Sequence, residues 1–122
     1  MNRSIIVKTQ LEALHHWPNI PSQHPMQFLK HSHRHIFHIE LKFKVNHNDR
    51  DLEFIDVKYR IDLFLKECFR RDAINGLVDM KSTSCEDLCE LLLNGFKYLG
   101  AFEVTVLEDN EMGSTLTLGE CL

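Results

Sequence analysis

Two segments of the chain alternate between apolar and polar side chains with a period of two residues. In residues 33–45 the odd positions run from two histidines into an apolar series: His33, His35, Phe37, Ile39, Leu41, Phe43 and Val45. Residues 4–16 alternate in the same way, with one parity occupied by Ile5, Val7, Thr9, Leu11, Ala13 and His15. Because this period is typical of half-buried β-strands, both segments are predicted to be strands.

The segment between these strands contains three prolines, at positions 18, 21 and 25. Proline cannot continue a central ladder, so the first strand is expected to end near Trp17 and a loop to run to about residue 30. A loop of this length within a small domain is usually functional. If the two strands pair as an antiparallel hairpin, the end of the first lies beside the start of the second. His15 would then lie next to His33 and His35.

Helical periodicity follows in two later segments. After Leu52 and Phe54, apolar residues recur at the spacing of a core-facing helical stripe: Val57, Ile61, Phe64, Leu65 and Cys68. A second helix is expected to open at Thr83, with Glu86 completing a capping box, and to end at Gly100. Its apolar stripe consists of Leu88, Leu92, Phe96 and Leu99.

The chain returns to strand patterning near its end. Phe102, Val104 and Val106 alternate with polar residues, residues 109–113 read as a turn, and residues 114–118 form a fourth strand with Leu116 and Leu118 inward. The order ββααββ predicts one α+β domain over residues 1–122. In this two-layer arrangement, a four-stranded antiparallel sheet carries both helices on one face.

Composition excludes several classes of function. A net charge of -4 argues against nonspecific nucleic-acid binding, which requires a basic surface. The apolar runs are too short to span a membrane, and the first residues lack the apolar region of a signal peptide. The four cysteines show no Cys-x-x-Cys spacing, so we expect reduced thiols in a cytoplasmic protein.

The histidines suggest a metal site. His15, His33 and His35 share one parity, and three histidine ligands with an open fourth position are typical of catalytic zinc. The alternative is that they are hydrogen-bonded core residues. His16 is the second choice for the ligand from the first strand. His31 has the parity of His33 and His35, so it could replace one of them or act as an acid or base.

A carboxylate continues the inward parity of the third strand. Glu108 follows Val104 and Val106 at a spacing of two, and burying a carboxylate is unfavourable unless it has a partner. It could accept two parallel N–H bonds from the amidine edge of a pterin or guanine-like ring. Alternatively, the strand ends at Val106 and Glu108 is solvated. Ser84 could present its hydroxyl and backbone N–H to the same ring, although helix capping explains it equally well.

Several short motifs occur in a recognisable order. Residues 11–15 read Leu-Glu-Ala-Leu-His, residues 33–37 read His-Arg-His-Ile-Phe, and residues 52–58 read Leu-Glu-Phe-Ile-Asp-Val-Lys. Residues 84–86 read Ser-Cys-Glu and residues 106–108 read Val-Leu-Glu. Together they resemble motifs of the 6-pyruvoyl-tetrahydropterin synthase and 6-carboxy-tetrahydropterin synthase family, and they span nearly the whole chain.

The resemblance implies a fold, an assembly and a site. It implies the tunnelling fold, in which ββααββ units join through their sheets into barrels, so a hexamer or another homo-oligomer is expected. It implies zinc held by His15, His33 and His35. It also implies a small-molecule heterocycle, a pterin or a related ring, anchored by Glu108 and transformed by lyase-type chemistry.

Two features of the family are missing. Its enzymes carry a catalytic cysteine shortly before the paired histidines, whereas residues 22–30 contain none. They also carry an Asp-His relay between the helices, whereas residues 70–82 contain no histidine. The sequence therefore leaves three hypotheses: a zinc-dependent enzyme with altered chemistry, a noncatalytic binding protein, and a structural oligomer that binds no ligand. The catalytic acid or base is unassigned, with His31, His24 and Asp72 as candidates. Asp72, Asp79 and His24 are the local candidates to replace the missing relay.

Overall fold

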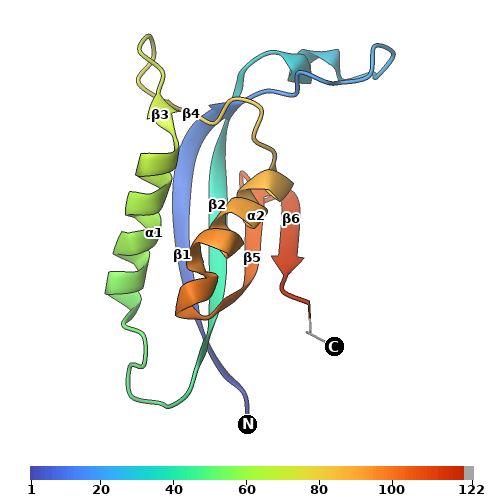
Figure 1. Ribbon diagram of the computed structural model, residues 1–122. Helices are drawn as coiled ribbons and strands as arrows, with labels where there is room; N and C mark the ends of the chain where they lie inside the picture. Colours follow the sequence, from blue (N-terminus) through green and yellow to red (C-terminus); the bar gives the residue numbers. More distant parts are fainter. Residues whose placement is uncertain (120–122) are drawn as a thin grey trace.

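The structure is a computed structural model that describes residues 1–119 (Figure 1). Two long strands, β1 (Arg3–His15) and β2 (His33–Val45), run through the centre of one sheet. They are antiparallel and pair without a register shift from Arg3 opposite Val45 to His15 opposite His33. The predicted hairpin is confirmed, and its register places the histidines of both strands at one end.

The sheet has six strands in the order β3-β4-β1-β2-β5-β6. The α+β class is confirmed, but the expected number of four strands is wrong. The two additional strands, β3 (Arg70–Arg71) and β4 (Val78–Asp79), form a short hairpin whose β4 pairs in parallel with β1 at Ala13 and Leu14. Two residues are too few to show alternation in a sequence, and the single parallel contact also contradicts the prediction of a purely antiparallel sheet.

The later strands, β5 (Ala101–Glu108) and β6 (Met112–Thr117), form a hairpin beside β2. A bulge opposite Lys42 and Phe43 makes Ala101 the buried residue at the start of β5, so the prediction of an inward Phe102 is wrong. Val104 and Val106 are fully buried, as expected. Leu116 and Leu118 were expected inward but are exposed. Leu116 lies on an outermost strand, and Leu118 follows the last residue of β6, Thr117.

Both helices, α1 (Phe54–Cys68) and α2 (Cys85–Phe96), lie on the same face of the sheet (Figure 1). The capping box of α2 joins Ser84 to Asp87, one residue later than the predicted pair of Thr83 and Glu86. Short 3-10 helices occur at Gln27–Lys30 (η1) and Lys97–Leu99 (η2). Gly100 adopts a left-handed conformation after η2 and turns the chain into β5.

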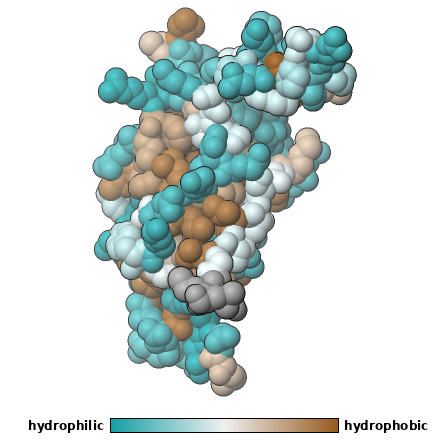
Figure 2. Space-filling model, turned by 45° about the vertical axis from the view of Figure 1, so that its right-hand side comes forward, coloured by the Kyte–Doolittle hydropathy of each residue, from teal (hydrophilic) through white to brown (hydrophobic). Residues whose placement is uncertain are grey.

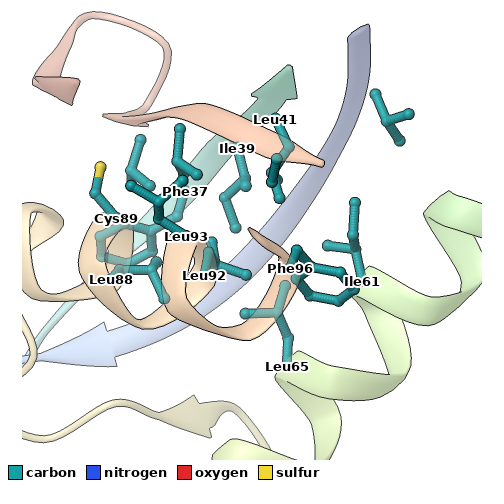
Figure 3. Close-up of a cluster of buried hydrophobic side chains, with 14 of the residues drawn as sticks. Phe37, Ile39, Leu41, Ile61, Leu65, Leu88, Cys89, Leu92, Leu93 and Phe96 are labelled. Carbon is teal, nitrogen blue, oxygen red and sulfur yellow. The ribbon is translucent and has the colours of Figure 1, made fainter. Parts of the chain in front are cut away.

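The core lies between the helices and the inward face of the sheet. Figure 3 shows side chains of α2 directed toward β2 and α1, with Leu88, Leu92 and Phe96 among Phe37, Ile39, Leu41, Ile61 and Leu65. The predicted stripe of α1 is confirmed at Val57, Ile61 and Leu65, whereas Cys68 is exposed. Cys68, Cys85 and Cys89 are free thiols, and Cys121 lies outside the described residues.

Figure 2 shows apolar side chains gathered near the middle of this face of the molecule. Mostly polar side chains surround them. The ends of the molecule are formed by loops and turns, including the long connection between β1 and β2. Within residues 1–119, no helix combines the length and the apolar character needed to cross a bilayer.

We expect Gly113→Ala to destabilise the protein. An added Cβ at this position would lie 1.8 Å from the backbone oxygen of Val106, so the β5–β6 ladder would have to shift. Urea denaturation should show a loss of about 2–3 kcal/mol in the free energy of unfolding. Gly119→Ala is the matched control, because nothing lies within 4 Å of its added Cβ. Equal stability of the two variants would contradict this packing.

Candidate metal centre

The predicted site residues meet at one end of the sheet. A cleft of about 680 Å³ opens there between the end of β1, the start of α2 and the β5–β6 turn. Its lining includes His15 and His33 together with Glu108 and Ser84. Residues from four distant segments of the sequence therefore share one cavity.

Three imidazoles converge beside this cleft. The ring centroids of His15 and His33 are 4.5 Å apart, and the His35 ring lies 5.4 Å from His15 and 5.2 Å from His33. One ring nitrogen from each residue lies within 4.8 Å of those of the other two, an arrangement that could hold a metal ion. His15 is buried, whereas His33 and His35 are partly exposed.

Each imidazole is held through its Nδ1 atom. Nδ1 of His15 lies 2.9 Å from the backbone oxygen of Thr83, and Nδ1 of His33 lies 2.8 Å from that of His31. Carbonyl oxygens only accept hydrogen bonds, so both Nδ1 atoms carry hydrogen. In the neutral rings, the Nε2 atoms therefore present lone pairs, which is the form that binds a metal ion.

The carboxylate of Asp109 accepts the corresponding hydrogen bond from Nδ1 of His35. Its Oδ2 lies 2.7 Å from Nδ1 of His35, and its Oδ1 accepts a 2.9 Å hydrogen bond from the backbone N–H of Ile36. These contacts, led by the Ile36 N–H, lower the pKa of Asp109 below its ordinary value. A carboxylate behind a metal-binding histidine fixes the ring orientation and raises the basicity of the ligand nitrogen.

The environment of His15 is compatible with a bound metal ion. Its Nε2 atom is buried and has no hydrogen-bond partner among the described residues. Burial is the main reason that the pKa of His15 lies below its ordinary value of 6.5. A buried nitrogen without a partner is unfavourable, and a metal ion would supply the missing one. Three imidazoles are a donor set that suits zinc among other divalent ions.

Glu108 faces the same nitrogens. Its Oε1 lies 3.5 Å from Nε2 of His15, and its Oε2 lies 3.3 Å from Nε2 of His35. The side chain is 23% exposed, because Glu108 ends β5 opposite Phe37 and borders the cleft. The alternative that Glu108 is simply solvated is therefore not what the structure shows.

Two residues at the start of α2 complete this side of the cleft. Sγ of Cys85 lies 3.8 Å from Oε1 of Glu108, and burial, followed by the charge of Glu108, raises the pKa of Cys85 to about 12. The thiol consequently stays protonated at neutral pH. Ser84 lines the cleft, but its hydroxyl already accepts the 3.0 Å hydrogen bond from the backbone N–H of Asp87.

The candidate acids and bases lie elsewhere. His31, His24, Asp72 and Asp79 do not line this cleft. His24 packs against Trp17 with ring centroids 5.2 Å apart, and Asp79 accepts a hydrogen bond from the backbone N–H of Lys81. His16 lines the cleft but is not part of the converging group. The structure thus brings together the proposed ligands and the carboxylate without the proposed relay residues.

Sequence reasoning missed the supporting contacts. Thr83 and His31 act through backbone oxygens, which no residue pattern reveals. Asp109 carried a weak signal, since an Asp-Asn pair after a strand marks a tight turn whose first side chain can hydrogen-bond locally. Asp109 and Asn110 both take positive φ, at 51° and 60°, and that turn aims the Asp109 carboxylate at His35.

Comparison with known proteins supports the fold alone. No family model matches the chain, and no curated protein matches it. Among solved structures, an uncharacterized protein from Wolinella succinogenes is similar to this chain with a TM-score of 0.62 and 12% sequence identity. The similarity covers 96% of this chain and 98% of that one. At this identity, the two proteins share a fold, and nothing follows about activity.

Asp109→Asn should weaken metal binding. Asparagine tolerates the left-handed backbone but lacks the charge and one of the two acceptor oxygens that hold His35 and Ile36. We expect zinc affinity, measured by competition with a chromogenic chelator, to fall about tenfold or more. Glu111→Gln in the same exposed turn is the control and should leave the affinity unchanged. An identical affinity in both variants would rule out a role for Asp109 behind His35.

Acidification should destabilise the metal-free protein through His15. Because the pKa of His15 is lowered on folding from 6.5, the unfolded chain takes up its proton at a higher pH. Stability from neutral His15 is complete above pH 6.5 and is lost as the pH falls toward the folded-state pKa. Urea denaturation at about pH 7.5 and about pH 5.5 gives the free energy of unfolding at each pH. The decrease in this free energy on acidification should be smaller for His15→Gln than for the wild type. A loss of the same size in both proteins would contradict this linkage.

Proposed function

We propose that this protein is a zinc-dependent relative of the 6-pyruvoyl-tetrahydropterin and 6-carboxy-tetrahydropterin synthases that acts on a pterin or related nitrogen heterocycle. The observation that carries the proposal is the convergence of His15, His33 and His35, each held through Nδ1. These three residues would hold the zinc through Nε2. When bound, zinc supplies a Lewis acid that polarises hydroxyl or carbonyl oxygens of a ligand.

The cleft supports a ring with N–H donors. Glu108 presents carboxylate oxygens that can accept the parallel N–H bonds of an amidine edge, and Trp17, Leu29 and Met112 supply apolar lining. None of the described residues that line it is Lys or Arg. An uncharged heterocycle therefore fits the charges of this cleft better than a phosphate group does. Ser84 would contribute mainly by capping α2 beside the ring.

Assembly through sheet edges is part of the proposal. On its outer side β1 pairs with another strand only at Ala13 and Leu14 among the described residues, so its segment from Arg3 to Glu12 has an open edge. The strand β6 ends the sheet at the opposite side. Unpaired backbone groups on such edges can join strands of another copy, which is consistent with a barrel-forming homo-oligomer of the tunnelling fold.

A noncatalytic binding protein is the second candidate. It is favoured by the placement of His31, His24 and Asp72 away from the cleft. The pKa of Cys85, raised to about 12, also makes that thiol a poor replacement for the cysteine that residues 22–30 lack. Both candidates share the same ion and the same ring-binding carboxylate. They differ only in whether protons move at the bound ligand.

The first experiment combines native mass spectrometry, metal analysis and titration with neopterin, an uncharged pterin. We expect the wild type to be a multimer that carries zinc and binds neopterin. The His33→Ala variant should bind no zinc, and its affinity for neopterin should be at least tenfold lower. His47→Ala is the control, because His47 lies beyond the opposite end of β2. Zinc retained by His33→Ala would exclude the proposed ligand set.

Turnover separates the two candidates. Zinc-loaded protein incubated with reduced pterins and monitored by mass spectrometry should give products that disappear in His33→Ala if the protein is an enzyme. Binding without any product in the wild type would support the binding protein.

A further inference from the structure

The contacts of Glu108 present an electrostatic conflict. The Nδ1 hydrogens of His15 and His35 are directed toward the Thr83 carbonyl and the Asp109 carboxylate. In neutral rings both Nε2 atoms are therefore acceptors. Yet a second acceptor group, the Glu108 carboxylate, lies 3.5 Å and 3.3 Å from them. Facing lone pairs repel each other unless a proton or a metal ion lies between them.

The spacing of these contacts is compatible with a zinc ion. Zinc binds imidazole nitrogen and carboxylate oxygen at about 2.1 Å, so two ligands of one tetrahedral ion lie about 3.4 Å apart. Oε1 of Glu108 lies 3.5 Å from Nε2 of His15, and Oε2 lies 3.3 Å from Nε2 of His35, so each oxygen is at this separation from one imidazole nitrogen. To become a ligand together with all three histidines, the carboxylate would also have to move closer to His33.

We propose that Glu108 is the fourth ligand of the ion in the ligand-free protein and that an incoming heterocycle displaces it. This inference rests on the proposed function, because it requires the zinc held by the three histidines. A site with four protein ligands has no open position, so the resting ion is protected until a ligand arrives. The displaced carboxylate is then free to accept the N–H groups of the ring.

The surroundings of Glu108 suit such an exchange. Among residues 1–119, only one of its oxygens, Oε1, has a further partner, the Cys85 thiol at 3.8 Å, and a thiol is a weak donor. No Lys or Arg forms a salt bridge with Glu108 within the described part of the chain. With its side chain at the border of the cleft, the carboxylate can turn from the ion toward a ligand by rotating about its own bonds.

Glu108→Gln separates a ligand role from a ring-binding role. Glutamine keeps the shape but lacks the charge, so zinc affinity measured by chelator competition should fall tenfold or more. Glu86→Gln is the matched control, since Glu86 lines the same cleft but accepts its hydrogen bond from the Ser114 hydroxyl, at 2.7 Å. Thermal melts of the metal-free proteins establish that both variants fold.

Cobalt(II) gives a readout independent of turnover. We expect the visible absorption of cobalt-substituted wild type to change in Glu108→Gln and also on addition of neopterin, because both remove the carboxylate from the ion. Zinc affinity within twofold of the wild type, with an unchanged cobalt spectrum in Glu108→Gln, would overturn the inference and leave the histidine site intact. A wild type that binds no zinc would overturn the proposed function itself, and the inference with it.

Discussion

The antiparallel register of β1 and β2 is the constraint on which the rest of this structure depends. Thirteen residues of each strand pair without a shift, so His15 is fixed opposite His33, and His35 follows on the same face. A slip of one residue would move every inward side chain of one strand to the opposite face. The alternation that buries Phe37, Ile39 and Leu41 also places the imidazoles on that same face of the sheet. The stability of the core and the geometry of the site therefore both depend on this register.

The remaining elements act on this end of the hairpin from three directions. The turn before α2 places the Thr83 carbonyl at His15, the residues before β2 place the His31 carbonyl at His33, and the β5–β6 turn places Asp109 at His35. Each contact occupies an Nδ1 atom. Two backbone carbonyls and one carboxylate, from segments far apart in the sequence, thus determine the direction in which the three Nε2 lone pairs point. Support of this kind gives a site its rigidity.

Alternation and parity were sufficient to predict the central hairpin, the two helical stripes and the histidine trio, because each follows from a period that residue types reveal. The strands β3 and β4 were not predicted, because a strand of two residues, such as Val78 and Asp79, is too short to show alternation. The strand β4 is held instead by its pairing with β1. The wrong orientation of Phe102 has a similar origin, because the bulge that reverses its parity is a property of pairing with β2. The predicted site was incomplete for a related reason: backbone carbonyl oxygens leave no trace in residue identity, and the Asp-Asn pair at Asp109 indicated a turn without indicating its contact with His35.

A site of this kind links metal binding to the stability of the fold. The buried Nε2 of His15 has no partner among the described residues, and an unsatisfied buried group of this type costs about 1–3 kcal/mol. A bound ion would remove that penalty and also relieve the repulsion between the imidazole lone pairs and Glu108. Because the unfolded chain holds no such arrangement, the free energy of binding an ion at the histidines would add to the free energy of unfolding. The three imidazoles and Glu108 at the end of the hairpin accordingly lower the stability of the metal-free protein.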